Sequence, residues 1–162
     1  IIVGVVNVLA TFVAIRYIDR FGRRPLLIVG LTIMVASGLT IALVSMTMGT
    51  GGAAGYITLV AVLMFVASFA MSMGPVTWVL IGELFPPEMR DKAMSSALSA
   101  NWGTNLVLSL AFLPLMQIVG TGAVFAGFAV INFALLVFVL RKLPETRGLT
   151  LTEIGALTAS SK

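Results

Sequence analysis

Long uncharged stretches constrain the fold of this chain more than any other feature. Charged side chains occur in three short blocks, at 16–24, 83–92 and 141–162. A helix rises about 1.5 Å per residue, so roughly 20 residues cross the hydrocarbon core of a bilayer. The stretches 25–82 and 93–140 are each long enough for two crossings, and the stretch 1–15 holds one shortened crossing. The mean hydropathy of +1.12 likewise indicates a chain that folds in lipid.

These lengths predict an all-α membrane protein with five transmembrane helices. The predicted spans are about 1–15, 26–48, 56–81, 94–115 and 121–140. They form one transmembrane unit over 1–142, followed by a polar tail over 143–162. Uncharged segments rich in turn residues, at 49–55 and 114–120, are expected to connect the paired spans outside the cell.

Charge and composition then set the orientation and exclude several functions. All 10 Lys and Arg residues lie in the three charged blocks, and the positive-inside rule places such blocks in the cytoplasm. We therefore expect a multi-pass protein of the cell membrane with a cytoplasmic C-terminus, whose net charge of +4 needs no nucleic acid as a partner. With no Cys and no His, the chain is expected to bind no metal or other cofactor and to be no enzyme.

The charged blocks also predict ion pairs between helices at the cytoplasmic edge. Asp19 and Glu83 are carboxylates at the rim of the membrane, and Arg23 and Arg90 lie at the same depth. An unpaired carboxylate at this depth is costly, which favours a salt-bridge cluster. Such a cluster can hold one conformation of a rocking transporter. The alternative is that the arginines merely follow the positive-inside rule.

Three amides are predicted near the middle of the bilayer. Asn7 precedes Arg16 by nine residues, and Asn101 follows Lys92 by nine, which is roughly 13 Å along a helix in each case. Asn105 shares a helix face with Asn101. Together with Trp102, these amides can hydrogen-bond and stack against a polyhydroxylated ligand. The alternative is that each Asn only bonds a neighbouring helix.

The third span carries a Gly74-Pro75 pair that predicts a kinked helix. Proline removes a backbone hydrogen bond, and discontinuous helices of this kind line transport sites. Trp78 follows the kink closely. We expect Trp78 to contact cargo or close an inner gate, the alternative being a tryptophan of the interfacial belt.

Four motifs in order resemble the sugar porter family of the major facilitator superfamily. DRFGRR at 19–24 is similar to the loop between the family's eighth and ninth helices, and GPVTW at 74–78 with ELFP at 83–86 and Arg90 resembles its tenth helix and following loop. Asn101-Trp102 with Asn105 resembles the eleventh-helix signature, and PETRG at 144–148 resembles the motif after the twelfth. The resemblance covers nearly the whole chain.

The resemblance implies helices eight to twelve of a twelve-helix fold that binds sugar between two six-helix halves. The positions it marks as sugar contacts are Asn7, Trp78, Asn101, Trp102 and, more weakly, Asn105. The positions it marks as a cytoplasmic gating network are Asp19, Arg23, Arg24, Glu83 and Arg90. Because the chain begins with Ile1 part-way through a span, we expect the N-terminal half to be missing.

Transport of a monosaccharide or polyol by alternating access is the function that these features predict. The partners expected are the sugar, protons if the parent is a symporter, the lipid bilayer and the N-terminal half of the same protein. A carrier of another small polar solute and a membrane sugar sensor without transport remain the alternatives. The five spans carry no charged residue at midplane depth, which argues against charged cargo.

Overall fold

Six helices make up the described part of the chain. The computed structural model describes residues 2–48 and 51–143, without the side chains of residues 17–21 and 84. The helices are α1 (Ile2–Phe21), α2 (Arg23–Thr47), α3 (Ala53–Met71), α4 (Met73–Leu84), α5 (Pro87–Val119) and α6 (Thr121–Lys142). The described residues form no strand, so the fold is all-α, as the charge pattern predicted.

The helices correspond to membrane-crossing segments. Four stretches are long and apolar enough to cross a bilayer: Arg23–Thr47, Ala53–Glu83, Pro87–Val119 and Thr121–Lys142. The second of these contains α3 and α4, and a shorter apolar helix covers Ile2–Arg16. The chain is therefore a multi-pass membrane protein.

The connection expected over 114–120 is much shorter than predicted, although it ends where it was expected to end. α5 continues through Pro114 to Val119, and Gly120 alone makes the turn into α6. Gly120 has φ 84°, a left-handed conformation that favours glycine, and its N–H donates to the carbonyl of Met116 at 3.1 Å. The turn therefore lies at Gly120, and the helix continues through Pro114.

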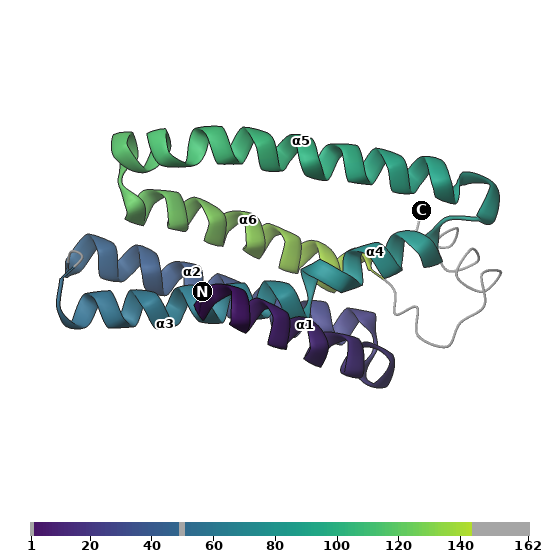
Figure 1. Ribbon diagram of the computed structural model, residues 1–162, viewed down its shortest axis with the longest axis horizontal. Helices are drawn as coiled ribbons and strands as arrows, with labels where there is room; N and C mark the ends of the chain where they lie inside the picture. The colour runs from purple at the N-terminus through teal and green to yellow at the C-terminus, as the bar shows by residue number, and fades with distance from the viewer. Residues whose placement is uncertain (1, 49–50, 144–162) are drawn as a thin grey trace.

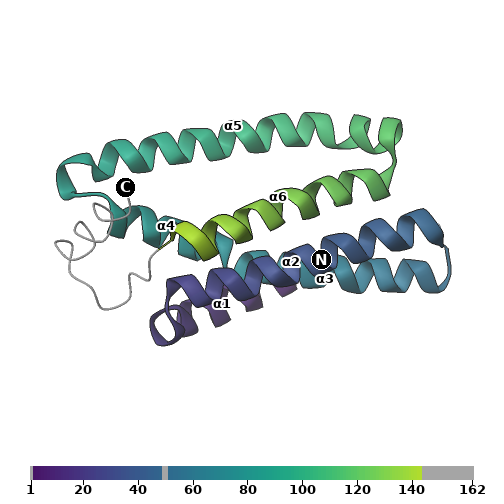
Figure 2. The same ribbon diagram turned by 180° about the vertical axis from the view of Figure 1, so that it is seen from behind.

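α2 forms the centre of the bundle. It packs along α6 on one side and along α3 on the other, and α1 lies on α3 (Figures 1 and 2). Small residues allow α2 and α6 to approach closely: a Cβ at Gly38 would lie 3.2 Å from the Ala129 Cβ, and one at Gly122 would lie 3.1 Å from the Ala42 carbonyl oxygen. In lipid, close packing of this kind replaces the hydrophobic effect as the source of helix association.

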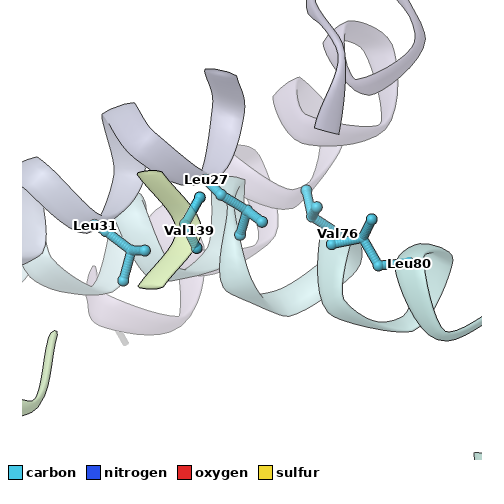
Figure 3. Close-up of a cluster of buried hydrophobic side chains, with 5 residues drawn as sticks. All are labelled: Leu27, Leu31, Val76, Leu80 and Val139. Atoms are coloured by element: carbon cyan, nitrogen blue, oxygen red, sulfur yellow. The ribbon is translucent and has the colours of Figure 1, made fainter. Parts of the chain in front are cut away.

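A compact apolar cluster joins α2, α4 and α6 toward the α2 N-terminus. Its buried members are Leu27, Leu31, Val76, Leu80 and Val139 (Figure 3). Leu31 and Val76 are completely buried. In this structure the cluster packs α4 against α2 and α6, and α4 carries Trp78 and Glu83.

α5 lies at the edge of the molecule and is mostly uncovered. Figures 1 and 2 both show it running beside α6 at the outer side of the bundle. None of its side chains is buried by the described residues. One aromatic contact is the stacking of Phe112 on Phe128 of α6, with ring centroids 6.3 Å apart. Nearly the whole surface of α5 is thus available to further helices, lipid or ligand.

Candidate functional site

The amides of α5 lie on one face, in the arrangement that their spacing predicted. The Asn105 Nδ2 donates to the Asn101 carbonyl oxygen at 2.9 Å and lies 3.4 Å from the Asn101 Oδ1. Both amides are exposed, and Trp102 beside them is 67% exposed. The contact with Asn105 uses the Asn101 oxygen and leaves the Asn101 Nδ2 free to donate to a ligand. This stretch of α5 is a polar strip in a helix that is otherwise apolar enough to cross a membrane.

Asn7 lies on α1 and is also exposed. Its carbonyl oxygen accepts a hydrogen bond from the Thr11 Oγ1 at 2.9 Å, which leaves its side-chain amide available. Asn7 and Thr11 line a shallow pocket of about 150 Å³ together with Val8, Phe12 and Ile15. Within the described residues α1 and α5 make no contact (Figure 1), so this part of the chain does not bring Asn7 and Asn101 together.

The break in the third span lies at Ser72, two residues before the predicted kink at Gly74 and Pro75. α3 ends at Met71 and α4 begins at Met73, so Gly74 and Pro75 fall in the first turn of α4. A helical N–H at position 75 would bond the carbonyl of Met71, and the proline ring would clash with that carbonyl. The helix therefore breaks between these two residues. Trp78 follows within α4 and is half-buried.

Arg23 and Glu83 form the ion pair that the charged blocks predicted. The Arg23 Nη2 lies 2.8 Å and its Nε 3.1 Å from the Glu83 Oε1, joining the first residue of α2 to the end of α4. The side chains are 14% and 27% exposed, so water screens the pair only in part. Two charge-assisted hydrogen bonds to one oxygen make this a strong contact.

The other members of the predicted cluster are placed differently. Arg24 donates from its Nη2 to the carbonyl oxygen of Leu140 at 2.8 Å, which positions a cation at the last turn of α6. Arg90, at the start of α5, has a buried Nε with no partner among the described residues. The side chain of Asp19 and the PETRG motif at 144–148 lie outside the described residues.

Sequence reasoning missed the Arg24–Leu140 bond and the role of Ser72. A backbone acceptor such as the Leu140 carbonyl has no residue signature, so the bond could not be predicted. Ser72 is completely buried, and its Oγ donates to the Ser68 carbonyl at 2.6 Å. The sequence signal for the break at Ser72 was Pro75, because a proline ring disrupts the helical turn that precedes it.

One pocket among the described residues is large but poorly suited to a sugar. It measures about 610 Å³ and lies between α2 and α3, with a lining dominated by apolar side chains such as Ile33, Ile57 and Met64. The hydroxyls of Thr32 and Thr40 in its wall already donate to the carbonyls of Ile28 and Ala36, at 2.7 and 2.8 Å. A sugar needs several converging polar partners, and the lining of this pocket is mainly apolar, whereas the polar strip of α5 carries two exposed amides.

Comparison with known proteins identifies related chains. Residues 1–157 match the family described as "Sugar (and other) transporter". The D-xylose-proton symporter-like 2 of Arabidopsis thaliana is 40% identical over 156 residues, which is 96% of this chain and 30% of that protein. The galactose-proton symporter of Escherichia coli K12 is 36% identical over 155 residues, covering 95% of this chain and 33% of that protein. The chain thus spans about a third of the length of these curated relatives.

Solved structures agree with the sequence relatives. The proton:xylose symporter XylE of the major facilitator superfamily, bound to 6-bromo-6-deoxy-D-glucose, matches with a TM-score of 0.84 at 35% identity, covering 96% of this chain and 33% of that one. The inward open form of the xylose transporter XylE from E. coli matches with a TM-score of 0.83 at 36% identity, covering 96% of this chain and 34% of that one. The six helices are a partial major-facilitator fold. The chain therefore belongs to the sugar (and other) transporter family.

Proposed function

We propose that this chain is the part of a sugar transporter that contains helices eight to twelve, and that the whole protein moves a monosaccharide or polyol by alternating access. The observation that carries the proposal is the exposed polar strip of α5, formed by Asn101, Trp102 and Asn105. Amides at mid-depth in a membrane helix are costly against lipid and are tolerated where they face a water-filled cavity. Because the chain belongs to the sugar (and other) transporter family, a sugar is the first candidate for the ligand in that cavity.

The rest of the protein would complete the site. Because the chain spans about a third of its relatives' length, we infer that an N-terminal portion covers the free face of α5 and supplies the opposite wall of the cavity. The isolated five-span portion would then not transport, since the cavity needs both halves. Two relatives are named as proton symporters, so protons are the coupling ion that we propose for the parent.

The residues divide into two groups with different roles in this proposal. The amides and indoles of Asn7, Trp78, Asn101, Trp102 and Asn105 would hold the sugar. The cytoplasmic residues Asp19, Arg23, Arg24, Glu83 and Arg90 would form the gating network, of which the pair of Arg23 with Glu83 is closed in this structure. Gly74 and Pro75 would keep α3 and α4 separate, so that α4 can move.

Uptake by the full-length parent tests the proposal. Labelled hexoses, pentoses and inositol are offered to cells that express the parent, with and without a proton gradient. We expect uptake of at least one sugar, and a symporter loses accumulation when the gradient is removed. Uptake of no sugar would contradict the proposal. In that case transport of another polar solute would favour the other-solute carrier, and sugar binding without flux would favour a sensor.

The proposed orientation has its own test, because the 162 residues contain no cysteine. In a parent without other cysteines, a membrane-impermeant maleimide is expected to label Gly51→Cys in intact cells and Lys142→Cys only after permeabilisation. Both positions are exposed, and a Cβ at Gly51 meets no atom within 4 Å. The positive-inside rule predicts this asymmetry. Labelling of Lys142→Cys in intact cells would overturn the cytoplasmic placement of the C-terminus.

A further inference from the structure

α4 is attached to α2 at three successive levels. At the start of α4, Ser72 lies against Gly30. In its middle, Val76 and Leu80 join the apolar cluster with Leu27 and Leu31 of α2, as Figure 3 shows. At its end Glu83 pairs with Arg23. The two helices therefore run antiparallel along one seam, and the three attachments differ in kind.

Ser72 is hydrogen-bonded to the end of α3 and also to the first turn of α4. Its N–H lies 3.1 Å from the Ser68 carbonyl oxygen and 3.3 Å from that of Phe69, and its hydroxyl donates to Ser68 as well. Its carbonyl oxygen accepts from the N–H of Val76 at 3.1 Å, within the first turn of α4. A residue that holds the end of one helix and starts the next is a pivot between them.

Gly30 provides the space that this pivot occupies. A Cβ built on Gly30 would overlap both the Oγ and the Cβ of Ser72, and would lie 3.2 Å from the Ser68 carbonyl oxygen. The Cβ of Ser72 is bonded directly to the backbone, so no rotation of the side chain can clear the overlap. Any side chain at position 30 must therefore push the pivot away from α2.

We propose that Gly30 is a positioning residue for the transport cycle: it seats Ser72 so that α4 turns about a fixed point while Trp78 and Glu83 move. The proposal rests on the proposed function, since it assigns α4 a motion within alternating access. Glu83 lies eleven residues beyond Ser72, or roughly 16 Å along the helix, so a turn of about 15° at the pivot displaces it by about 4 Å. That displacement is enough to break the pair with Arg23, which lies 2.8 Å away.

A distance measurement on the full-length parent tests directly whether Gly30 positions α4 through Ser72. Spin labels at Leu43→Cys on α2 and Phe85→Cys after α4 report the position of α4, because both side chains are exposed. We expect Gly30→Ala to shift the distance between the labels by a few Å and to lower the maximal uptake rate about tenfold, as overpacking of a close contact does.

Two further variants distinguish a specific contact between Gly30 and Ser72 from a general packing defect in α2. Ser72→Gly removes the atoms that an alanine at position 30 would meet, so Gly30→Ala with Ser72→Gly is expected to restore both the distance and the rate. Gly38→Ala is the matched control on the same helix: its Cβ would lie 3.2 Å from the Ala129 Cβ of α6. It is expected to lower thermal stability without moving α4.

The outcomes decide the proposal in each case. It is overturned if Gly30→Ala changes neither distance nor rate, if the double variant stays impaired, or if Gly38→Ala moves α4 equally. Should Gly30→Ala fail to fold, the double variant is expected to fold because it removes the overlap, and its label distance and uptake rate then decide the proposal. The distances need no sugar flux. Failure of the proposed function and failure of this inference are therefore distinguishable.

Discussion

Glu83→Gln in the full-length parent is expected to lower the maximal uptake rate about tenfold, because charge-assisted hydrogen bonds contribute roughly 1.5–3 kcal/mol and 1.4 kcal/mol is a factor of ten. The substitution removes the charge from the oxygen that accepts from the Arg23 Nε and Nη2 at 3.1 and 2.8 Å. The guanidinium is 14% exposed, so little water can replace the lost partner. Conformations in which this pair is closed are thereby disfavoured, while the sugar-binding amides are untouched.

Three companion variants define the cause of the loss. Arg23→Lys keeps the charge but not the two donors directed at one oxygen, so we expect it to fall between Glu83→Gln and the unsubstituted parent. Exchange of the charges, Arg23→Glu with Glu83→Arg, is expected to recover part of the rate. Glu88→Gln is the control, since Glu88 is an exposed carboxylate at the start of α5. Equal losses in Glu83→Gln and Glu88→Gln would argue against a specific role for the pair.

Asn101→Ala is expected to weaken sugar binding by about 10- to 100-fold, since each lost hydrogen bond to a buried partner costs roughly 1–3 kcal/mol. The Asn101 Oδ1 lies 3.4 Å from the Asn105 Nδ2, but that nitrogen also bonds the Asn101 backbone oxygen at 2.9 Å. Asn105 therefore keeps an anchor in the variant, and the loss reports on Asn101 itself. Equilibrium binding of labelled sugar to the purified parent is the measurement.

Asn132→Ala is the matched control for the amide. Asn132 lies on α6, is 7% exposed and donates to the Phe128 carbonyl oxygen at 2.8 Å. Its loss is expected to lower thermal stability and to leave sugar affinity unchanged, because it lies within the bundle. If Asn101→Ala bound sugar as tightly as the unsubstituted parent, the polar strip of α5 would lose its proposed role.

Much of the fold followed from charge placement, and the remainder depended on packing. The uncharged stretches predicted the helices because an apolar segment of about 20 residues satisfies its own backbone hydrogen bonds in lipid as a helix. The connection before α6 was predicted to begin six residues too early, at Pro114, and the break at Ser72 was expected two residues later, at Gly74 and Pro75. A proline signals a disturbance of the helix without its exact position. The close contact of Gly30 with Ser72 could not be predicted, because a glycine in an apolar stretch does not reveal which neighbour it meets.

The candidate site was predictable to a similar degree. The four-residue spacing was enough to predict that Asn101 and Asn105 share one face of α5, and opposite charges at one edge were enough to predict the pair of Arg23 with Glu83. The joint placement of Asn7 with that strip stays a prediction. α1 and α5 make no contact within the described residues, so these residues do not test the proposed cavity between them.

Counterflow in proteoliposomes tests the central claim, sugar transport by alternating access, most directly. The purified full-length parent is reconstituted, the vesicles are loaded with unlabelled sugar, and labelled sugar is added outside without a proton gradient. We expect transient accumulation of label above equilibrium for a sugar that the parent binds, and a strong reduction of this accumulation in Asn101→Ala at the same sugar concentration. Binding of the sugar with no counterflow would contradict alternating-access transport and would favour a sensor.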